Sequence, residues 1–205
     1  MTQAHVYSAP AIAAHLPPGS RQVTSDVALI GRIAAGDKVA MLALFVRHNG
    51  RVFRFVLGRL KDRSVAEDLV SEVFLEAWRQ AHRFEARAAV STWLLAIARH
   101  KAMSMQRRLK THYELDAALA IEDPSASPQA AAEIKERDAV LRDCLSKLSP
   151  NHREILELAY YHEEPVEAVA KIVGIPINTA KTRMHYARKH LAGLLLQGGV
   201  DRTAL

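Results

Sequence analysis

The sequence is poor in the residues and motifs that mark catalytic or metal sites. Its single cysteine, Cys144, cannot form an intrachain disulfide, and its place in an apolar helical pattern favours a buried, unreactive thiol. The ten histidines show no paired metal-ligand spacing, and phosphate-loop, GxGxxG and nucleophile-elbow motifs are absent. We therefore expect no enzyme activity, no metal ion and no cofactor.

Long hydrophobic runs and strand-like alternation are missing as well. No apolar segment is long enough to cross a bilayer, and the N-terminus lacks the basic start and apolar core of a secretory signal. These absences predict a cytoplasmic protein without membrane insertion. Apolar residues recur instead at intervals of three and four, which predicts an all-α fold.

The chain is basic, and its charge is distributed unevenly. Residues 24–110 hold sixteen Lys and Arg against eight Asp and Glu, whereas residues 111–132 hold four acids and no Lys or Arg. Residues 133–196 are nearly balanced, with ten bases and nine acids. A basic first half favours a polyanionic partner, although basic excess alone is equally compatible with an ordinary solvated surface.

Proline-rich and acidic stretches divide the chain into two small helical domains joined by a flexible acidic linker. The turn-rich segment Asp123–Pro128 marks the linker, and the aperiodic, proline-containing start of the chain predicts a flexible extension. The predicted divisions are the N-terminal extension 1–23, a first domain 24–110, the linker 111–132, a second domain 133–196 and the C-terminal tail 197–205.

Local signals predict several helix ends. Ser25 and Ser64 are suited to cap helices, and Gly36 followed by Asp37 interrupts the apolar pattern between two of them. Ser149 before Pro150 predicts another helix start, and residues 83–89 predict a loop.

The most informative stretch is Glu167–Arg183, which indicates a short apolar helix, a turn at Gly174 and a second helix with basic and hydroxyl side chains. This pattern is typical of a helix-turn-helix, whose second helix enters the DNA major groove. Residues predicted to face the core are Ile177, Ala180, Met184, Ala187, Leu191 and Leu194, and the opposite face holds Asn178, Thr182, His185 and Lys189. Because residues 176–196 contain no acid, DNA binding is favoured over a surface helix with chance positive charge.

Two further groups of charged residues stand out in the first domain. Asp68, Glu72 and Glu76 are four residues apart, so they form one row on a helix face and repel one another by a few tenths of a kcal/mol per pair. A basic protein partner would reverse that sign, but a solvated face with Arg63 and Arg79 nearby explains the row equally well.

The second group is a basic run of five residues without an acid, which suits a track along phosphates. Its members are Arg99, Lys101, Arg107, Arg108 and Lys110. Phe84 and Trp93 flank the loop that precedes it, and aromatic residues in such positions are more often core than base-stacking.

Four segments together resemble bacterial sigma factors of the extracytoplasmic-function (ECF) group. Ala66–Trp78 is similar to their polymerase-binding helix, and Ser91–Arg99 to the helix that follows their promoter-melting loop. Leu148–Ile155 and Asn178–Arg188 are similar to parts of their C-terminal DNA-binding domain. The order, lengths and short linker agree with that group over about residues 24–196.

The resemblance implies a non-catalytic factor that binds core RNA polymerase, through its β′ clamp helices and β flap, and directs it to promoter DNA. Residues 24–110 would be sigma domain two and residues 133–196 sigma domain four. An anti-sigma factor is a further partner that the group implies.

The resemblance also assigns site residues. Polymerase contacts would come from Asp68, Glu72, Phe74 and Glu76. Contacts to the minus-ten element would come from Phe84, Arg87, Ser91, Arg99, Lys101, Arg107 and Arg108. Contacts to the minus-thirty-five element would come from Asn178, Thr179, Lys181, Thr182, Arg183, His185, Tyr186 and Arg188.

Some positions depart from the group's pattern, and two alternative functions remain. Ala86 stands where a loop glycine is common and Tyr186 where arginine is frequent, which leaves the promoter sequence open. One alternative is a dimeric helix-turn-helix regulator that binds a palindromic site without polymerase. The other is a nucleic-acid hydrolase that uses the acidic row with a metal ion, although no second acidic cluster completes such a site.

Overall fold

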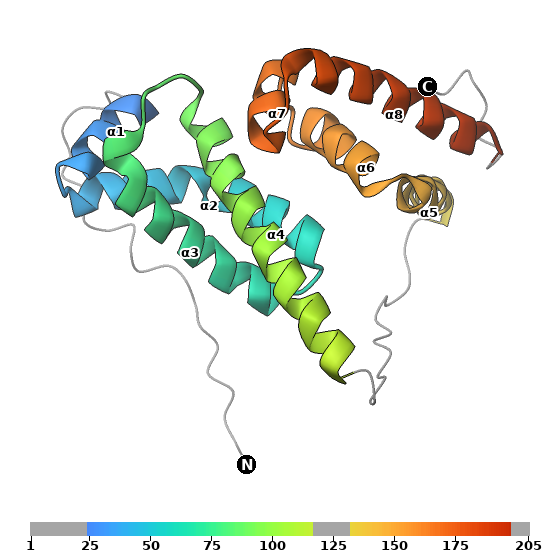
Figure 1. Ribbon diagram of the computed structural model, residues 1–205, viewed down its shortest axis with the longest axis horizontal. Coiled ribbons are helices and arrows are strands. Elements are labelled where there is room, and N and C mark those ends of the chain that lie inside the picture. Colours follow the sequence, from blue (N-terminus) through green and yellow to red (C-terminus); the bar gives the residue numbers. More distant parts are fainter. Residues whose placement is uncertain (1–23, 117–131, 198–205) are drawn as a thin grey trace.

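A computed structural model of the chain describes residues 24–116 and 132–197, and these residues form helices and connecting loops without any strand (Figure 1). The predicted all-α class is therefore confirmed. The predicted extension 1–23, the part of the predicted linker at 117–131, and residues 198–205 of the predicted tail lie outside the described residues.

The N-terminal unit consists of four α-helices that pack around one core. They are α1 (Asp26–Ala34), α2 (Lys38–Leu60), α3 (Arg63–Gln80) and α4 (Val90–Asp116), with a short 3-10 turn, η1 (Ala81–Arg83), after α3. Helix α4 packs against both α2 and α3. The fully buried side chains include Leu44, Val56, Leu69, Val73, Leu94 and Leu95.

Polar side chains cap the first three helices of this unit. Ser25 accepts a hydrogen bond from the Ala28 amide at 3.2 Å, as predicted, and Asp37 accepts from two amides in the first turn of α2. Helix α3 is capped by Asp62, which accepts from the Val65 amide at 3.0 Å, and not by Ser64. Asp62 caps the helix in place of Ser64 because it stands directly before the first helical residue, where its carboxylate reaches a free amide of the first turn.

Helix α4 continues to Asp116, into the segment predicted as linker. Residues 111–116 contain neither glycine nor proline, so nothing in the covalent chain stops the helix before that point. Its 27 residues make a rod about 40 Å long at 1.5 Å per residue.

The C-terminal unit is built from four shorter elements and one long helix. They are α5 (Ala132–Lys147), α6 (Pro150–Leu156), a π-helical turn η2 (Glu157–Tyr161), α7 (Val166–Val173) and α8 (Ile177–Gln197). Ser149 caps α6 with Pro150 in its first turn, and Cys144 is buried with 2% exposure, both as predicted. The buried side chains of this unit include Leu148, Ile155, Leu158, Val169, Ala180 and Ala187.

Helices α7 and α8 form the predicted helix-turn-helix. Gly174 takes φ 73°, a left-handed conformation that ends α7, and its amide donates to the Ala170 carbonyl at 2.9 Å. The predicted core face of α8 is correct for Ala180, Met184 and Ala187. It is wrong for Ile177, the first residue of α8, which is 37% exposed.

The two units lie against each other. Helix α7 packs alongside α4 (Figure 1). Side chains of α2 and α4 pair with groups on α6 and on the segment before α7. This arrangement decides which charged residues of the N-terminal unit are open to solvent.

Leu94→Ala should lower the free energy of unfolding of the N-terminal unit by about 2–5 kcal/mol, because it leaves a cavity at a position with 0% exposure. Leu75→Ala makes the same truncation on α3 at a position that is 49% exposed, and it should change that free energy by about 0.5 kcal/mol or less. Urea denaturation followed by circular dichroism measures both. Equal losses would contradict the assigned core.

Candidate nucleic-acid and protein interfaces

The acidic row on α3 is largely open to solvent. Asp68 and Glu72 are exposed and Glu76 is half-buried, while Leu69 and Val73 on the opposite side are buried in the core. Glu72 pairs with Lys101 of α4 at 3.1 Å. Arg63 pairs with Glu67, one residue before Asp68, at 3.0 Å.

One apolar residue of α3 differs from expectation, and a second exposed one was not among the predicted contacts. Phe74, predicted to touch polymerase, is buried, and its ring packs edge-on against Phe45 with centroids 4.8 Å apart. Leu75 is exposed and, at 100° per residue, lies only about 20° around the helix from Asp68. Its spacing of seven residues from Asp68 is the sequence signal that indicates a place for Leu75 on the same face of the helix. The exposed surface is therefore a mixed one, acidic with one apolar side chain.

The loop between η1 and α4 presents one aromatic pair and one strained residue. Phe84 and Trp93 are each half-buried, and their ring centroids lie 5.0 Å apart. Ala86 takes φ 54°, a left-handed conformation that favours glycine, which agrees with its position at a common loop glycine. Arg87 is exposed and pairs with Glu85 at 2.6 Å, and Ser91 lies half-buried in the first turn of α4.

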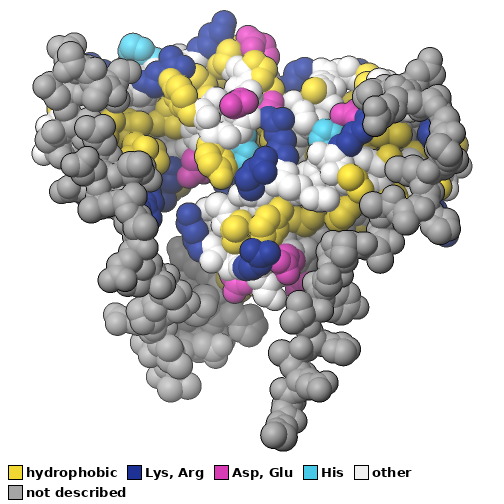
Figure 2. Space-filling model, turned by 180° about the vertical axis from the view of Figure 1, so that it is seen from behind, with side chains coloured by type: hydrophobic (Ala, Val, Ile, Leu, Met, Phe, Trp, Pro, Cys, Tyr) yellow, Lys and Arg dark blue, Asp and Glu magenta, His cyan; other side chains and the backbone are white. Residues whose placement is uncertain are grey.

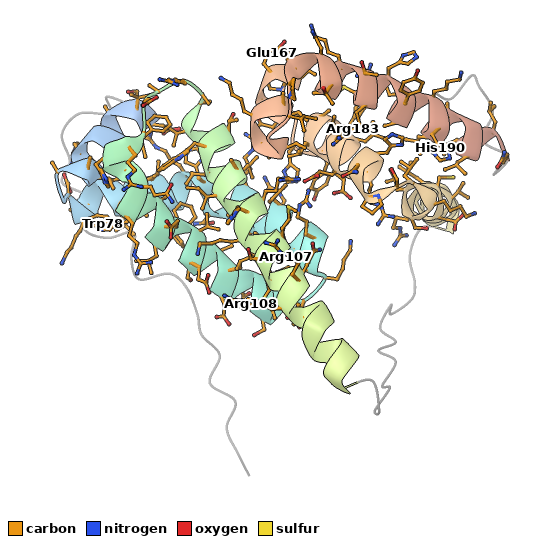
Figure 3. The ribbon with its side chains drawn as sticks, viewed as in Figure 1. Trp78, Arg107, Arg108, Glu167, Arg183 and His190 are labelled. Carbon is orange, nitrogen blue, oxygen red and sulfur yellow. The ribbon has the colours of Figure 1, made fainter. Side chains whose placement is uncertain are left out.

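The predicted basic run on α4 is divided into parts with different surroundings. Arg99 pairs with Glu154 of the C-terminal unit at 2.6 Å, and Lys101 pairs with Glu72. Arg107 and Arg108 are exposed on the half of α4 that lies farther along the chain (Figure 3). The side chain of Lys110 lies outside the described residues. Of the basic residues whose side chains are described, only Arg107 and Arg108, on the later part of the helix, are exposed.

Helix α8 presents a polar face that agrees with the predicted one. All the residues predicted to face the minus-thirty-five element are exposed except Arg183, which is half-buried; the exposed ones are Asn178, Thr179, Lys181, Thr182, His185, Tyr186 and Arg188. An open hollow of about 440 Å³ lies between this face and α6, lined by His152, Asn178, Thr179, Thr182, Arg183 and Tyr186. Amide, hydroxyl, imidazole and guanidinium groups together suit phosphates and base edges.

His152 and Tyr160 belong to this surface, and neither is among the predicted site residues. His152 lies in the first turn of α6, and it borders the hollow. Tyr160 is exposed, and the Arg188 guanidinium lies over its ring at 5.4 Å from the centroid. Neither residue is next to α8 in sequence, so only the fold brings them there.

The remaining surface is mixed in charge and holds no evident metal cluster. Lys and Arg side chains occur over both units on the face seen in Figure 2. Within the described ranges, no three His, Cys, Asp or Glu residues are grouped so that they could hold a metal ion. Within the same ranges, no helix has both the length and the apolar character needed to span a bilayer.

Comparison with known proteins agrees with the division into two units. Residues 44–111 match the family model of Sigma-70 region 2, and residues 138–191 match that of Sigma-70, region 4. The first match covers most of α2 to α4, including the acidic row. The second covers the C-terminal unit, including most of the helix-turn-helix.

Curated relatives that match this chain over nearly their whole length are ECF RNA polymerase sigma factors. The ECF RNA polymerase sigma factor SigK of Mycobacterium bovis is 30% identical over 183 residues, which span 86% of this chain and 97% of that protein. The ECF RNA polymerase sigma factor SigL of Mycobacterium tuberculosis is 28% identical over 181 residues, which span 86% of this chain and 100% of that protein.

A solved structure supports the same fold. The sigma factor RpoE in complex with the anti-sigma factor NepR, from Bartonella quintana, superposes with a TM-score of 0.60 at 26% identity, over 77% of this chain and 96% of that one. Family match, relatives and architecture agree, and the chain therefore belongs to the ECF sigma factors of RNA polymerase, which act in promoter-specific initiation of transcription.

Proposed function

We propose how this sigma factor divides its contacts among its surfaces. The N-terminal unit binds core polymerase through the acidic row on α3, formed by Asp68, Glu72 and Glu76, with Leu75 beside it. The C-terminal unit reads the minus-thirty-five element with the polar face of α8. The observation that carries the proposal is that the two units present exposed surfaces of opposite character, one acidic and one free of acids.

The acidic row suits a protein partner better than a nucleic acid. A carboxylate face repels DNA phosphates, whereas basic groups of a partner stabilise it. The exposed Leu75 adds apolar area at the same place. Phe74 contributes to this surface from below, by fixing α3 on the core next to Phe45. We place the β′ clamp helices of polymerase here and the β flap on the C-terminal unit.

Promoter opening by this chain requires no chemical step. The loop at Phe84 and Arg87 lies before α4, and Arg107 and Arg108 follow along the same helix. Capture of an unstacked minus-ten base at the loop, with strand phosphates on α4, offsets the unstacking cost of a few kcal/mol per step. The protein thus acts without catalysis or a cofactor, in the cytoplasm where polymerase and promoters are present.

An anti-sigma factor is a further proposed partner. The relative from Bartonella quintana is held in a complex with one, and that relative shares the two-unit fold. A protein that covers the acidic row of α3 would compete directly with polymerase for this sigma factor.

Asp68→Arg should weaken association with core polymerase by about tenfold or more, because it reverses a charge in a surface that faces basic groups. Glu67→Arg changes the net charge equally but lies about 100° around α3 from Asp68, so it should have much less effect. Fluorescence anisotropy with labelled sigma factor measures both. Equal losses would show that only net charge matters.

Lys181→Ala should reduce transcription selectively at promoters with one minus-thirty-five sequence, because a lost base contact costs about 1–3 kcal/mol at the base it reads. In vitro transcription with core polymerase over a set of minus-thirty-five variants measures the preference. Lys147→Ala, at the end of α5, is the matched control. A uniform loss over all variants would make Lys181 a phosphate contact only.

The proposal as a whole is tested by holoenzyme formation. Purified chain and core polymerase should together transcribe from a subset of a random promoter library, and neither should do so alone. Failure to form a holoenzyme would overturn it. Tight polymerase-independent binding to a palindromic site would favour the dimeric regulator instead.

A further inference from the structure

An apolar stripe on the first half of α2 is open to solvent. Val39, Leu42 and Val46 are 60%, 46% and 66% exposed. At about 100° per residue they lie within about 60° of one another around the helix, on the side away from the buried Leu44. Single exposed apolar side chains are ordinary, whereas several along one line of a helix indicate a contact surface. We call these three residues the α2 stripe.

The α2 stripe is not part of the core of the N-terminal unit. Helix α2 packs against α1, α3 and α4, and its buried side chains include Ala40, Leu44 and Phe55. The stripe also lies outside the acidic row on α3 and the polar face of α8. Neither the fold nor the proposed contacts with polymerase and promoter therefore account for it.

The chain enters the N-terminal unit beside the α2 stripe. Nη1 of Arg47 donates to the Thr24 carbonyl at 2.6 Å and to Oδ1 of Asp26 at 2.8 Å. Nε2 of His48 lies 2.8 Å from Oδ2 of the same carboxylate. Because Arg47 directly follows Val46 on α2, the segment that precedes Thr24 starts next to one end of the stripe.

This attachment of the chain is charged at neutral pH. Burial raises the pKa of Asp26, but the hydrogen bonds and positive charges of Arg47 and His48 outweigh it, so that pKa lies below its ordinary value. The carboxylate is therefore ionised at neutral pH, and the attachment weakens only as the pH falls through that lowered pKa. Thr24 is thus a fixed starting point for the segment before it.

That segment contains an apolar run. Residues 11–16 read Ala-Ile-Ala-Ala-His-Leu, and residues 1–23 hold neither Asp nor Glu, no Lys and one Arg, Arg21. Seating residues 11–16 on the α2 stripe would remove the apolar side chains of Ile12 and Leu16 from water without desolvating a carboxylate or a guanidinium. The run therefore matches the stripe in chemical character.

The chain length also permits this contact. Seven residues, 17–23, join the run to Thr24 and span up to about 25 Å when extended, a path that Pro17 and Pro18 favour. The stripe extends over the seven residues from Val39 to Val46, which is about 10 Å along the helix axis. Residues 11–16 therefore reach every part of the stripe from where the chain enters.

A tethered segment suits this surface better than a second copy of the chain. A stable interface between separate molecules needs about 20–30 residues on each side, far more than the stripe offers. A short flexible tether instead supplies an effective concentration of about 1 mM, so even a contact with a Kd of about 1 mM between separate molecules would be half occupied. The small area of the stripe thus favours an occupant from the same chain.

We propose that residues 11–16 dock on the α2 stripe, so that the N-terminal unit includes part of the segment predicted to be a flexible extension. The proposal is independent of the proposed polymerase and promoter contacts, because it uses neither the acidic row on α3 nor α8. Docking covers Val39, Leu42 and Val46, and it leaves the exposed Leu75 on α3 unaffected.

The first test compares the full chain with a variant that lacks residues 2–16. In methyl NMR spectra, the signals of Val39, Leu42 and Val46 should shift on deletion, because their neighbours are removed. The methyl signals of Leu75, which is exposed on α3, provide the control within the same spectrum and should stay in place. Unchanged signals from the stripe would overturn the proposal.

The second test maps the contact by photo-crosslinking in the full chain. A benzophenone amino acid at position 39 should crosslink to residues 11–16 of the same chain, as mass spectrometry of the digested product would show. The same probe at position 75 should give no such product. Crosslinks only between two copies would assign the stripe to self-association, and products without residues 11–16 would also overturn the proposal.

The third test weakens the contact from either side. Val46→Asp and Ile12→Asp should each lower the yield of that crosslink by about tenfold, because docking would place a carboxylate against apolar side chains. Val46→Leu keeps the apolar character and should preserve the yield. Leu75→Asp makes a comparable change outside the stripe and should also preserve it. Equal losses from Val46→Asp and Leu75→Asp, with unchanged circular dichroism, would contradict docking on the stripe.

Discussion

Glu154, held between Arg59 and Arg99, is the interaction on which the arrangement of this protein depends. It joins the end of α2, the middle of α4 and helix α6 of the C-terminal unit in one small cluster of charge. A carboxylate in that position is stabilised only while both arginines surround it, since a buried charge without partners is costly. The relative placement of the two units, and with it the exposure of each proposed binding surface, follows from keeping this cluster together.

The surfaces outside that cluster are set by helix periodicity. On α3, residues four apart place Asp68 and Glu72 on the side away from the core that Leu69 and Val73 fill. On α8, the same rule turns the side chains of Lys181 and its polar neighbours outward while Ala180 and Ala187 face inward. Each unit thus needs only an amphipathic helix to display its charges, and a family of promoter selectivities can arise from changes in outward side chains alone.

Much of the fold could be predicted from sequence because its signals are local. The cap at Ser149, the turn at Gly174 and the outward face of α8 each depend on residues within one or two turns. The burial of Phe74 depends on its packing against Phe45, 29 residues earlier in the chain, which the periodicity of α3 does not reveal. The pairing of Arg51 with Glu164 joins residues 113 positions apart, and no local pattern indicates it.

The position of Cys144 has a practical consequence. It is the only cysteine of the sequence, and its side chain is buried in the C-terminal unit. Thiol-reactive fluorophores modify accessible thiolates, so they would attach to a cysteine introduced at the surface while sparing this one in the native fold. Distances between the two halves of the molecule can therefore be followed by energy transfer during assembly, with the natural thiol left in place.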